Sequence, residues 1–314
     1  MNQGWVYSDR ITAAAAGLSA LDFYAARYRH SSRDEWKDRI LSGQIRQNGS
    51  PVALDDRLQP GQTLTYHRSP WQEPEVPLGF EVLYEDEDLM AIAKPASLPV
   101  LPGGNFLTHT LLHQLKQRYP KHPPVPVHRL GRGTSGVMVL GRSPLARSVL
   151  SRQLRESTAT AYDPQAPHPI CKTYRALVSA GDLPDRFVLT TPIGKVDYPA
   201  LGYVYGASPS GLTAYTEGSV LHRSSTSTLV EVTIRTGRPH QIRIHMAAAG
   251  VPLVGDPLYG VGGVPLSQPP ETEPVPVPGD TGYHLHAHRL RLPHPRTQES
   301  LDITCPAPAA LQMP

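Results

Sequence analysis

The sequence predicts a protein that combines α-helices and β-strands, of class α/β and more narrowly α+β. A small N-terminal module precedes a larger domain. Three observations lead to this prediction. A helix-start signal and a hairpin-turn signal lie within the first 50 residues, residues 69–78 are rich in proline and polar side chains, and apolar strand patterns alternate with helical ones after residue 80. With 314 residues, the chain is long enough for two domains. We expect a module over residues 1–70, a linker over 71–79 and a main domain over 80–314.

The N-terminal module is expected to contain two helices and a small hairpin. Apolar residues from Leu18 to Tyr28 fall near helical spacing, and Ser32 with Glu35 forms a capping box ahead of a helix over residues 33–41. Gly43 is a natural helix stop. A short strand over residues 45–47 then runs into Asn48-Gly49, the dipeptide of a type I′ hairpin turn.

This order of elements is similar to the RNA-binding module of the S-four type, first described in a small-subunit ribosomal protein. The resemblance is carried by Ser32, Arg33, Trp36, Ile40, Gly43, Ile45, Asn48 and Gly49. It implies that Arg33 and Trp36 contact RNA. The alternative is a small αβ module that makes no contact with RNA.

The main domain is expected to alternate strands and helices. Residues 80–84 and 89–93 should form an antiparallel pair, and further strands are expected at 137–140, 172–179 and 229–236. Helices are expected at 110–118, 145–154 and 240–249. Residues 202–210 are typical of a loop, and the proline-rich residues 266–282 of an exposed, mobile insertion.

Charge is distributed unevenly, although the net charge is only +3. Between Leu89 and Arg155 the chain has ten Lys or Arg residues and no Asp or Glu. A basic stretch without carboxylates favours a polyanionic partner such as nucleic acid, because phosphate contacts need cations that no acid neutralises. The alternative is an ordinary solvated basic face.

Composition argues against several classes of protein. Two cysteines, Cys171 and Cys305, are too few for a disulfide framework or a structural zinc site. The chain has no secretory leader pattern, and no apolar run approaches the length of a membrane span. We expect a cytoplasmic protein without a membrane association. A monomer with no obligate protein partner is expected, because no apolar face is evidently self-complementary.

The segment Val127–Gly136 carries the most specific motif. Its frame of His128, Arg129, Leu130, Thr134, Ser135 and Gly136 resembles the loop His-Arg-Leu-Asp-x-x-Thr-Ser-Gly of RluA-type RNA pseudouridine synthases. The Asp of that pattern falls on Gly131. Four further segments resemble the family in the right order, namely 172–178, 235–245, 255–260 and 285–290 together with the C-terminal residues that follow.

The resemblance implies a fold, a reaction and a set of site residues. The fold is a mixed, mainly antiparallel sheet, and the reaction isomerises uridine to pseudouridine in ribosomal or transfer RNA without a cofactor. Tyr174 would stack on the base that leaves the helix, and Arg243 would pair with the loop carboxylate. The RNA would also be contacted by Arg129, Arg132, Thr134, Arg238 and His240.

Gly131 leaves two hypotheses open. In the first, the protein is an isomerase in which another carboxylate, from Asp256, Asp163 or Asp197, enters the site. In the second, it is a non-catalytic RNA-binding protein on the same scaffold, with Arg243 unpaired and able to hold a phosphate, because glycine has no side chain to act as nucleophile or base.

Two other patterns have less specific explanations. Gly131, Gly133 and Gly136 also satisfy the glycine pattern of dinucleotide-binding folds, with Glu156 at a suitable distance, but that pattern requires a helix where Val137–Leu140 predicts a strand. His284, His286 and His288 alternate along the chain and could bind a metal ion. A half-exposed strand explains them equally well, and we expect neither a metal nor a cofactor.

Overall fold

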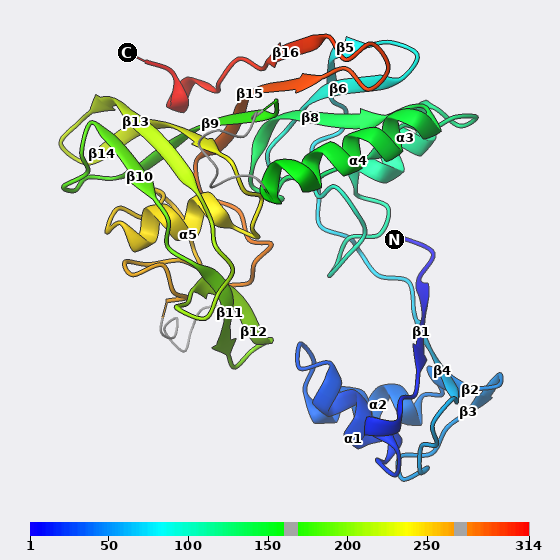
Figure 1. Cartoon of the computed structure of the whole chain (residues 1–314). Helices are drawn as coiled ribbons and strands as arrows, with labels where there is room; N and C mark the ends of the chain where they lie inside the picture. Colours follow the sequence, from blue (N-terminus) through cyan, green and yellow to red (C-terminus); the bar gives the residue numbers. More distant parts are fainter. Residues whose placement is uncertain (160–168, 267–274, 314) are drawn as a thin grey trace. The chain divides into compact units, whose positions relative to one another are not determined.

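The computed structural model describes residues 1–159, 169–266 and 275–313, and Figure 1 shows their elements coloured along the sequence. Contacts divide the chain into two compact units. Unit 1 comprises Met1–Glu73 with Asp197–Tyr203, and unit 2 comprises Pro74–Val196 with Val204–Pro314.

Unit 1 contains a four-stranded antiparallel sheet, in the order β1-β4-β2-β3, and two helices. The elements are β1 (Trp5–Arg10), a 3₁₀ turn (Ala13–Ala15), α1 (Ala20–Arg27), α2 (Arg33–Leu41), β2 (Ile45–Gln47), β3 (Ser50–Pro51) and β4 (Thr63–Arg68). Side chains from both helices and the sheet meet in one apolar core, centred on Tyr24, Trp36, Ile40, Ile45 and Leu64.

The local signals of this unit are confirmed. The Ser32 hydroxyl accepts the Glu35 N–H, and the Glu35 carboxylate accepts the Ser32 N–H at 2.7 Å. Asn48 and Gly49 both have positive φ, at 51° and 86°, as a type I′ turn requires. Strand β1 was not predicted, because only Asp9 among its residues is buried and no apolar alternation marks it.

Unit 2 is built on a ten-stranded sheet that follows the order β10-β13-β14-β9-β15-β8-β6-β5, with β16 paired to β15 and β7 paired to β8. The pair β15–β8 is parallel and the other pairs are antiparallel, which confirms the mixed, mainly antiparallel sheet. Its strands are β5 (Glu81–Glu85), β6 (Leu89–Lys94), β7 (Val125–Pro126), β8 (Ser135–Gly141), β9 (Cys171–Ser179), β10 (Arg186–Leu189), β13 (Thr216–Arg223), β14 (Ser227–Ile234), β15 (Leu285–Pro293) and β16 (Ser300–Thr304).

Helices cover both faces of this sheet. Met138 and Leu140 of β8 pack in one cluster with residues of α3 (Leu111–Arg118) and α5 (Gln241–Ala248). The alternate residues Val137 and Val139 pack in a second cluster with α4 (Pro144–Ala159). Because successive strand residues point to opposite faces, α3 and α5 cover one face and α4 covers the other. No helix within the described ranges is both long and apolar enough to span a bilayer.

The structure also corrects part of the predicted element order. Residues 202–207, expected to be a loop, form β12 (Gly202–Ala207), which pairs with β11 (Ile193–Tyr198). The alternation there is short and rests on Val204 and Gly206, so its glycines resembled a turn. The half-exposed strands β10 and β13 also lacked a clear pattern. Of the predicted mobile insertion, residues 267–274 lie outside the described part.

Asp88 ties three distant segments of unit 2 together. Its buried carboxylate accepts hydrogen bonds from the Ser143 hydroxyl at 2.6 Å, just ahead of α4, and from the Arg296 guanidinium at 2.5 and 2.8 Å, between β15 and β16. These donors, with Arg296 contributing most, lower the pKa of Asp88 to about 2 from its usual 3.8.

The Asp88 contacts predict a stability that depends on pH in the acid range. The folded-state pKa lies below the unfolded value, so the contribution is complete above about pH 4 and is lost as pH falls towards 2. We expect the free energy of unfolding to fall over this interval in denaturant titrations. Asp88→Asn should flatten that dependence, and an unchanged slope would contradict the assignment.

Candidate active site

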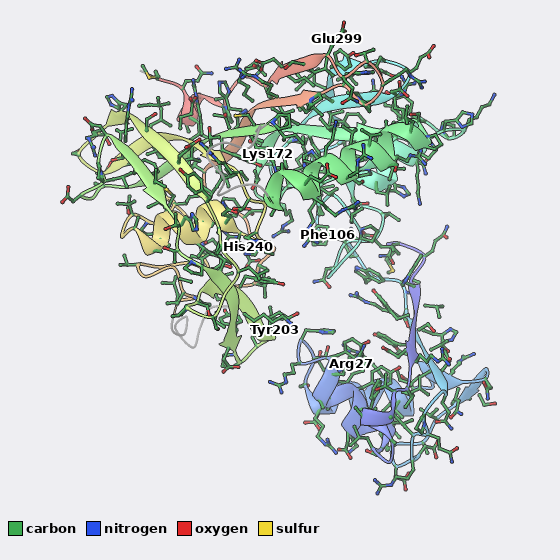
Figure 2. All side chains as sticks on the ribbon, viewed as in Figure 1. Arg27, Phe106, Lys172, Tyr203, His240 and Glu299 are labelled. Carbon is green, nitrogen blue, oxygen red and sulfur yellow. The ribbon has the colours of Figure 1, made fainter. Side chains whose placement is uncertain are left out.

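A pocket of about 600 Å³ lies in unit 2. Its walls come from the loop ahead of β8, from α4, from β9, from the turn between β14 and α5 and from the start of β15. Lys172 and His240, labelled in Figure 2, belong to two of these walls. The remaining lining residues are Val127, His128, Arg129, Leu130, Gly131, Thr134, Ser151, Leu154, Arg155, Thr158, Tyr174, Ile234, Gly237, Arg238, Gln241, Ile242, Arg243, Tyr283 and Leu285.

The pocket is strongly cationic. Five of its lining residues are basic, and within the described part of the chain none is acidic; the basic residues are Arg129, Arg155, Lys172, Arg238 and Arg243. Arg129 and Arg155 are exposed, whereas Arg243 is only 2 % exposed. Exposed guanidinium groups at the mouth of a pocket are suited to phosphate oxygens, which they bind with paired N–H donors.

A buried amine, that of Lys94, forms a hydrogen bond with the loop that carries Gly131. Lys94 at the end of β6 donates from Nζ to the carbonyl oxygens of Leu98 at 2.8 Å and Arg132 at 3.3 Å. Burial lowers the pKa of Lys94 to about 7. The loop closes with a hydrogen bond from the Thr134 N–H to the Gly131 carbonyl at 3.1 Å. These contacts hold the loop in place, and residues 128–131 and 134 of the loop line the pocket.

Burial keeps two histidines of the pocket neutral. His128 accepts the Val139 N–H at Nε2, 2.9 Å away, and burial lowers its pKa to about 4. His240 has a left-handed backbone (φ 55°) at the N-cap of α5, its Nδ1 lies 2.7 Å from the Tyr259 hydroxyl, and burial lowers its pKa to about 4. His240 therefore presents a neutral ring to the pocket at physiological pH.

Tyr174 lies in the middle of β9, which pairs with both β14 and β15. Its ring is 9 % exposed and lines the pocket. Burial raises the pKa of Tyr174 to about 12, so the phenol is protonated at neutral pH. The structure thus provides a fixed aromatic wall, which the family resemblance assigns to stacking on a base.

Arg243 is paired with a carboxylate other than the one the family motif supplies. Its Nε and Nη2 each donate to Asp256 at 2.7 Å, and the two side chains are 3 % and 1 % exposed. Asp256 also accepts the N–H groups of Leu258 and Tyr259. This corrects the expectation that Arg243 is unpaired and able to hold a phosphate.

Neither of the two alternative carboxylates that the structure describes, Asp256 and Asp197, lines the pocket. Asp256 is within reach of Arg243, but its oxygens are occupied and it is not a lining residue. Asp197 belongs to unit 1. Asp163 lies outside the described residues.

Tyr283 fills the space beside Gly131 and Gly133. A Cβ built on Gly131 would lie 2.8 Å from the Tyr283 hydroxyl oxygen, and one on Gly133 would lie 2.8 Å from its ring carbon Cζ. The hydroxyl is also 3.3 Å from Thr134 Oγ1, and the Arg243 guanidinium carbon lies 4.2 Å from the ring centroid. Both glycines are therefore required by the position of one aromatic ring.

Most of the predicted site residues come together in this pocket. Gly131, Tyr174, Arg243, Arg129, Thr134, Arg238 and His240 all line it. Arg132 does not; its Nε donates to the Gly279 carbonyl at 2.6 Å. Arg155, Lys172 and Tyr283 line the pocket but were not singled out. Arg155 and Tyr283 fall outside the family motifs that were compared, so only the fold identifies them.

The two predicted RNA contacts of unit 1 differ in exposure. The Arg33 side chain is 58 % exposed and pairs with Asp22 at 2.8 Å. Trp36 is 1 % exposed, its Nε1 donates to the Tyr28 carbonyl, and it packs in the core of the unit. This corrects the expectation that Trp36 contacts RNA, because a buried ring has no free face on which a base can stack.

Two other sequence patterns, the glycines of residues 131–136 and the alternating histidines of residues 284–288, have ordinary structural roles. Gly136 lies within strand β8, where a dinucleotide site would require the start of a helix. His286 and His288 each direct a ring nitrogen to the Cys305 carbonyl, at 3.1 and 2.9 Å. Among the described residues, no group of three or more His, Cys, Asp or Glu side chains could hold a metal ion.

The buried ion pair predicts a large loss of stability when one charge is removed. Asp256→Asn keeps the side-chain shape but leaves Arg243 as an uncompensated buried cation, so unfolding should become easier by about 3–5 kcal/mol. Urea titrations would measure this. Asp302→Asn, which removes the carboxylate of the exposed pair with Arg289, is the matched control and should have a much smaller effect. Equal effects would contradict the role of burial.

The contact of Gly131 with Tyr283 predicts a coupling between the two positions. Gly131→Ala should lower the free energy of unfolding by about 1–3 kcal/mol, because the new methyl group overlaps the Tyr283 hydroxyl. The cost should be smaller when Tyr283→Phe is also present. Gly103→Ala is the control, since a Cβ there meets no atom within 4 Å. Additive effects in the double-mutant cycle would argue against the contact.

Comparison with known proteins places the fold and the motifs in one family. A family model described as RNA pseudouridylate synthase matches residues 88–248, which include the Gly131 loop, Tyr174 and Arg243. The human protein RNA Pseudouridylate Synthase Domain Containing 1 has a similar fold, with a TM-score of 0.56 and 23 % identity over 77 % of this chain and 89 % of that one.

Two relatives match nearly the whole chain. An uncharacterized RNA pseudouridine synthase of Synechocystis is 51 % identical over 94 % of this chain and 96 % of its own length. RNA pseudouridine synthase 5 of Arabidopsis thaliana is 39 % identical over 99 % of this chain and 95 % of its own. Together with the match to the family model, these similarities show that the chain belongs to the RNA pseudouridine synthase family.

Proposed function

We propose that this protein isomerises uridine to pseudouridine in structured RNA, either ribosomal or transfer RNA. The observation that carries the proposal is the single pocket shared by Tyr174, Arg243 and the Gly131 loop. These residues lie far apart in the sequence, yet they border the same volume. Relatives that cover almost the whole chain bear the name RNA pseudouridine synthase.

The pocket has the size and chemistry for a nucleotide turned out of its helix. A volume of about 600 Å³ is within the range of small-ligand sites, and Tyr174 supplies an aromatic surface. Tyr174, His128 and His240 are neutral at physiological pH, because burial disfavours their charged forms. These neutral side chains suit an uncharged uracil ring, which must leave the base stack before its glycosidic bond can be reached.

We expect basic side chains at the mouth of the pocket to bind the RNA backbone. Arg129 and Arg155 are exposed there, and Arg238 is half-buried, with its Nε donating to the Thr213 carbonyl at 2.9 Å. Contacts of this kind fix the position of the RNA without reading its sequence, and they weaken as salt displaces them. We assign a further RNA contact to Arg33 on unit 1, whose side chain is largely exposed.

A second candidate function is RNA binding without isomerisation. The specific observation in its favour is that no Asp or Glu lines the pocket within the described residues, while Asp256 is paired with Arg243. In that case the same pocket would hold a flipped base and release it unchanged. The two candidates share their RNA-binding residues and differ only in the chemical step.

Mapping of pseudouridine separates the two candidates. Total RNA from a strain that lacks the gene would be incubated with the purified protein and mapped at nucleotide resolution. We expect new pseudouridine sites with the natural protein and with Tyr119→Leu, which changes a half-buried tyrosine outside the pocket. Tyr174→Leu should lose them, because it removes the aromatic wall.

The opposite result is equally informative. RNA binding by the natural protein without any new pseudouridine would reject the isomerase and favour the second candidate. Sites that persist in Tyr174→Leu would show that the pocket described above is not where the base reacts.

A further inference from the structure

The pocket contains one hydroxyl group at the place where its family motif puts a carboxylate. The motif position is Gly131, and the Tyr283 hydroxyl oxygen lies 2.8 Å from where a Cβ of residue 131 would be. That separation is close to the reach of an Asp carboxylate oxygen from its own Cβ. Gly131 and Tyr283 are both lining residues of the pocket.

We propose that the Tyr283 hydroxyl is the catalytic group of this protein and takes the place of the missing loop carboxylate. The inference rests on the proposed function, since it names the residue that performs the isomerisation. Tyr283 comes from the segment just ahead of β15, which is more than 140 residues beyond the loop. The substitution therefore involves two distant parts of the chain, with glycine at 131 and 133 making room for the ring.

The surroundings of Tyr283 fix its ring and favour the developing charge. The Arg243 guanidinium carbon lies 4.2 Å from the ring centroid, and Asp256 holds Arg243 there through two hydrogen bonds of 2.7 Å. The cation is attracted to the negatively polarised face of the ring, which holds the ring in position. Thr134 Oγ1, 3.3 Å from the hydroxyl, can accept its hydrogen or donate to the oxygen as charge builds up. Tyr283 itself is 6 % exposed, so water competes little with these contacts.

The reaction balances with this one hydroxyl. In the first step the Tyr283 oxygen bonds to C1′ of the uridine as the N1–C1′ bond breaks; the bonding pair stays on N1, which takes the phenol proton. The freed uracil then turns within the pocket. In the second step C5 bonds to C1′ as the C1′–O bond to Tyr283 breaks, and the phenolate oxygen takes the proton that leaves C5. No oxidant, reductant or further reactant is needed, and the enzyme is regenerated.

Release of tritium from the uracil C5 position tests the proposal, because C5 loses its hydrogen only when the carbon–carbon bond has formed. RNA labelled with tritium at C5, from a strain that lacks the gene, would be mixed with an excess of protein for single-turnover rates. Tyr283→Phe removes only the hydroxyl and keeps the ring over Arg243. We expect its rate to fall at least about 100-fold, while its affinity for the RNA and its thermal midpoint stay near those of the natural protein. Tyr119→Phe, which removes a phenol hydroxyl outside the pocket, should react at the natural rate.

A further variant separates failure of this inference from failure of the proposed function. Gly131→Asp combined with Tyr283→Ala places a carboxylate in the loop and opens the space it needs. If the natural protein is active and Tyr283→Phe reacts within about threefold of it, the role of Tyr283 is rejected and the proposed function stands. If the natural protein is inactive while the double variant releases tritium, Tyr283 fills the site without acting in it, and both proposals fail. Inactivity of both proteins, with RNA still bound, rejects the isomerase and the inference that depends on it.

Discussion

The pocket depends on the buried ion pair between Arg243 and Asp256. Arg243 projects from the first turn of α5, and Asp256 lies in the turn that follows the helix, where it also accepts two backbone N–H groups. A guanidinium that is 3 % exposed would be too costly to bury alone, so the carboxylate is a condition for its place in the wall. The pair in turn supports the ring of Tyr283. The helix, the turn and the start of β15 are thus organised around one charge and its partner.

The pocket combines neutral buried groups with exposed cations. In the interior, His128, His240 and Tyr174 are neutral, since burial shifts each pKa away from the charged form at neutral pH. At the mouth, Arg129 and Arg155 remain exposed to water. A nucleotide has the same division, with an uncharged base and a charged phosphate. Of the ten basic residues between Leu89 and Arg155, Arg129 and Arg155 line the pocket, whereas Arg142 and Arg152 pair with acids outside that stretch.

The loop of residues 128–134 retains the framework of its family while the reactive side chain is absent. Lys94 and the turn from Thr134 to Gly131 hold the backbone in place. Gly131 removes the carboxylate of the motif, but it also makes room for Tyr283. The Tyr283 ring could not occupy its position beside a larger residue at 131 or 133. The Tyr283 ring and the two glycines form one packing unit. Chemistry at this site must therefore be assigned from what surrounds Gly131 in space and not from the motif alone.

The sequence by itself determined the local elements and the family. The capping box of Ser32 and Glu35 and the Asn48-Gly49 turn act within a few residues, so their signals are complete in the sequence. The family resemblance likewise assigned Tyr174, Arg243 and the Gly131 loop to one site, and these residues line one pocket in the structure.

Only the tertiary structure decided the partners of these residues. Asp256 was one of three candidate carboxylates, and its pairing with Arg243 depends on how the turn after α5 folds back. Tyr283 carries no local signal, and its relation to Gly131 spans more than 140 residues. Trp36 matched a motif and yet belongs to a core, since a sequence pattern records residue types but not the side from which neighbours cover them. Contacts between distant segments arise from packing, which no single stretch of sequence encodes.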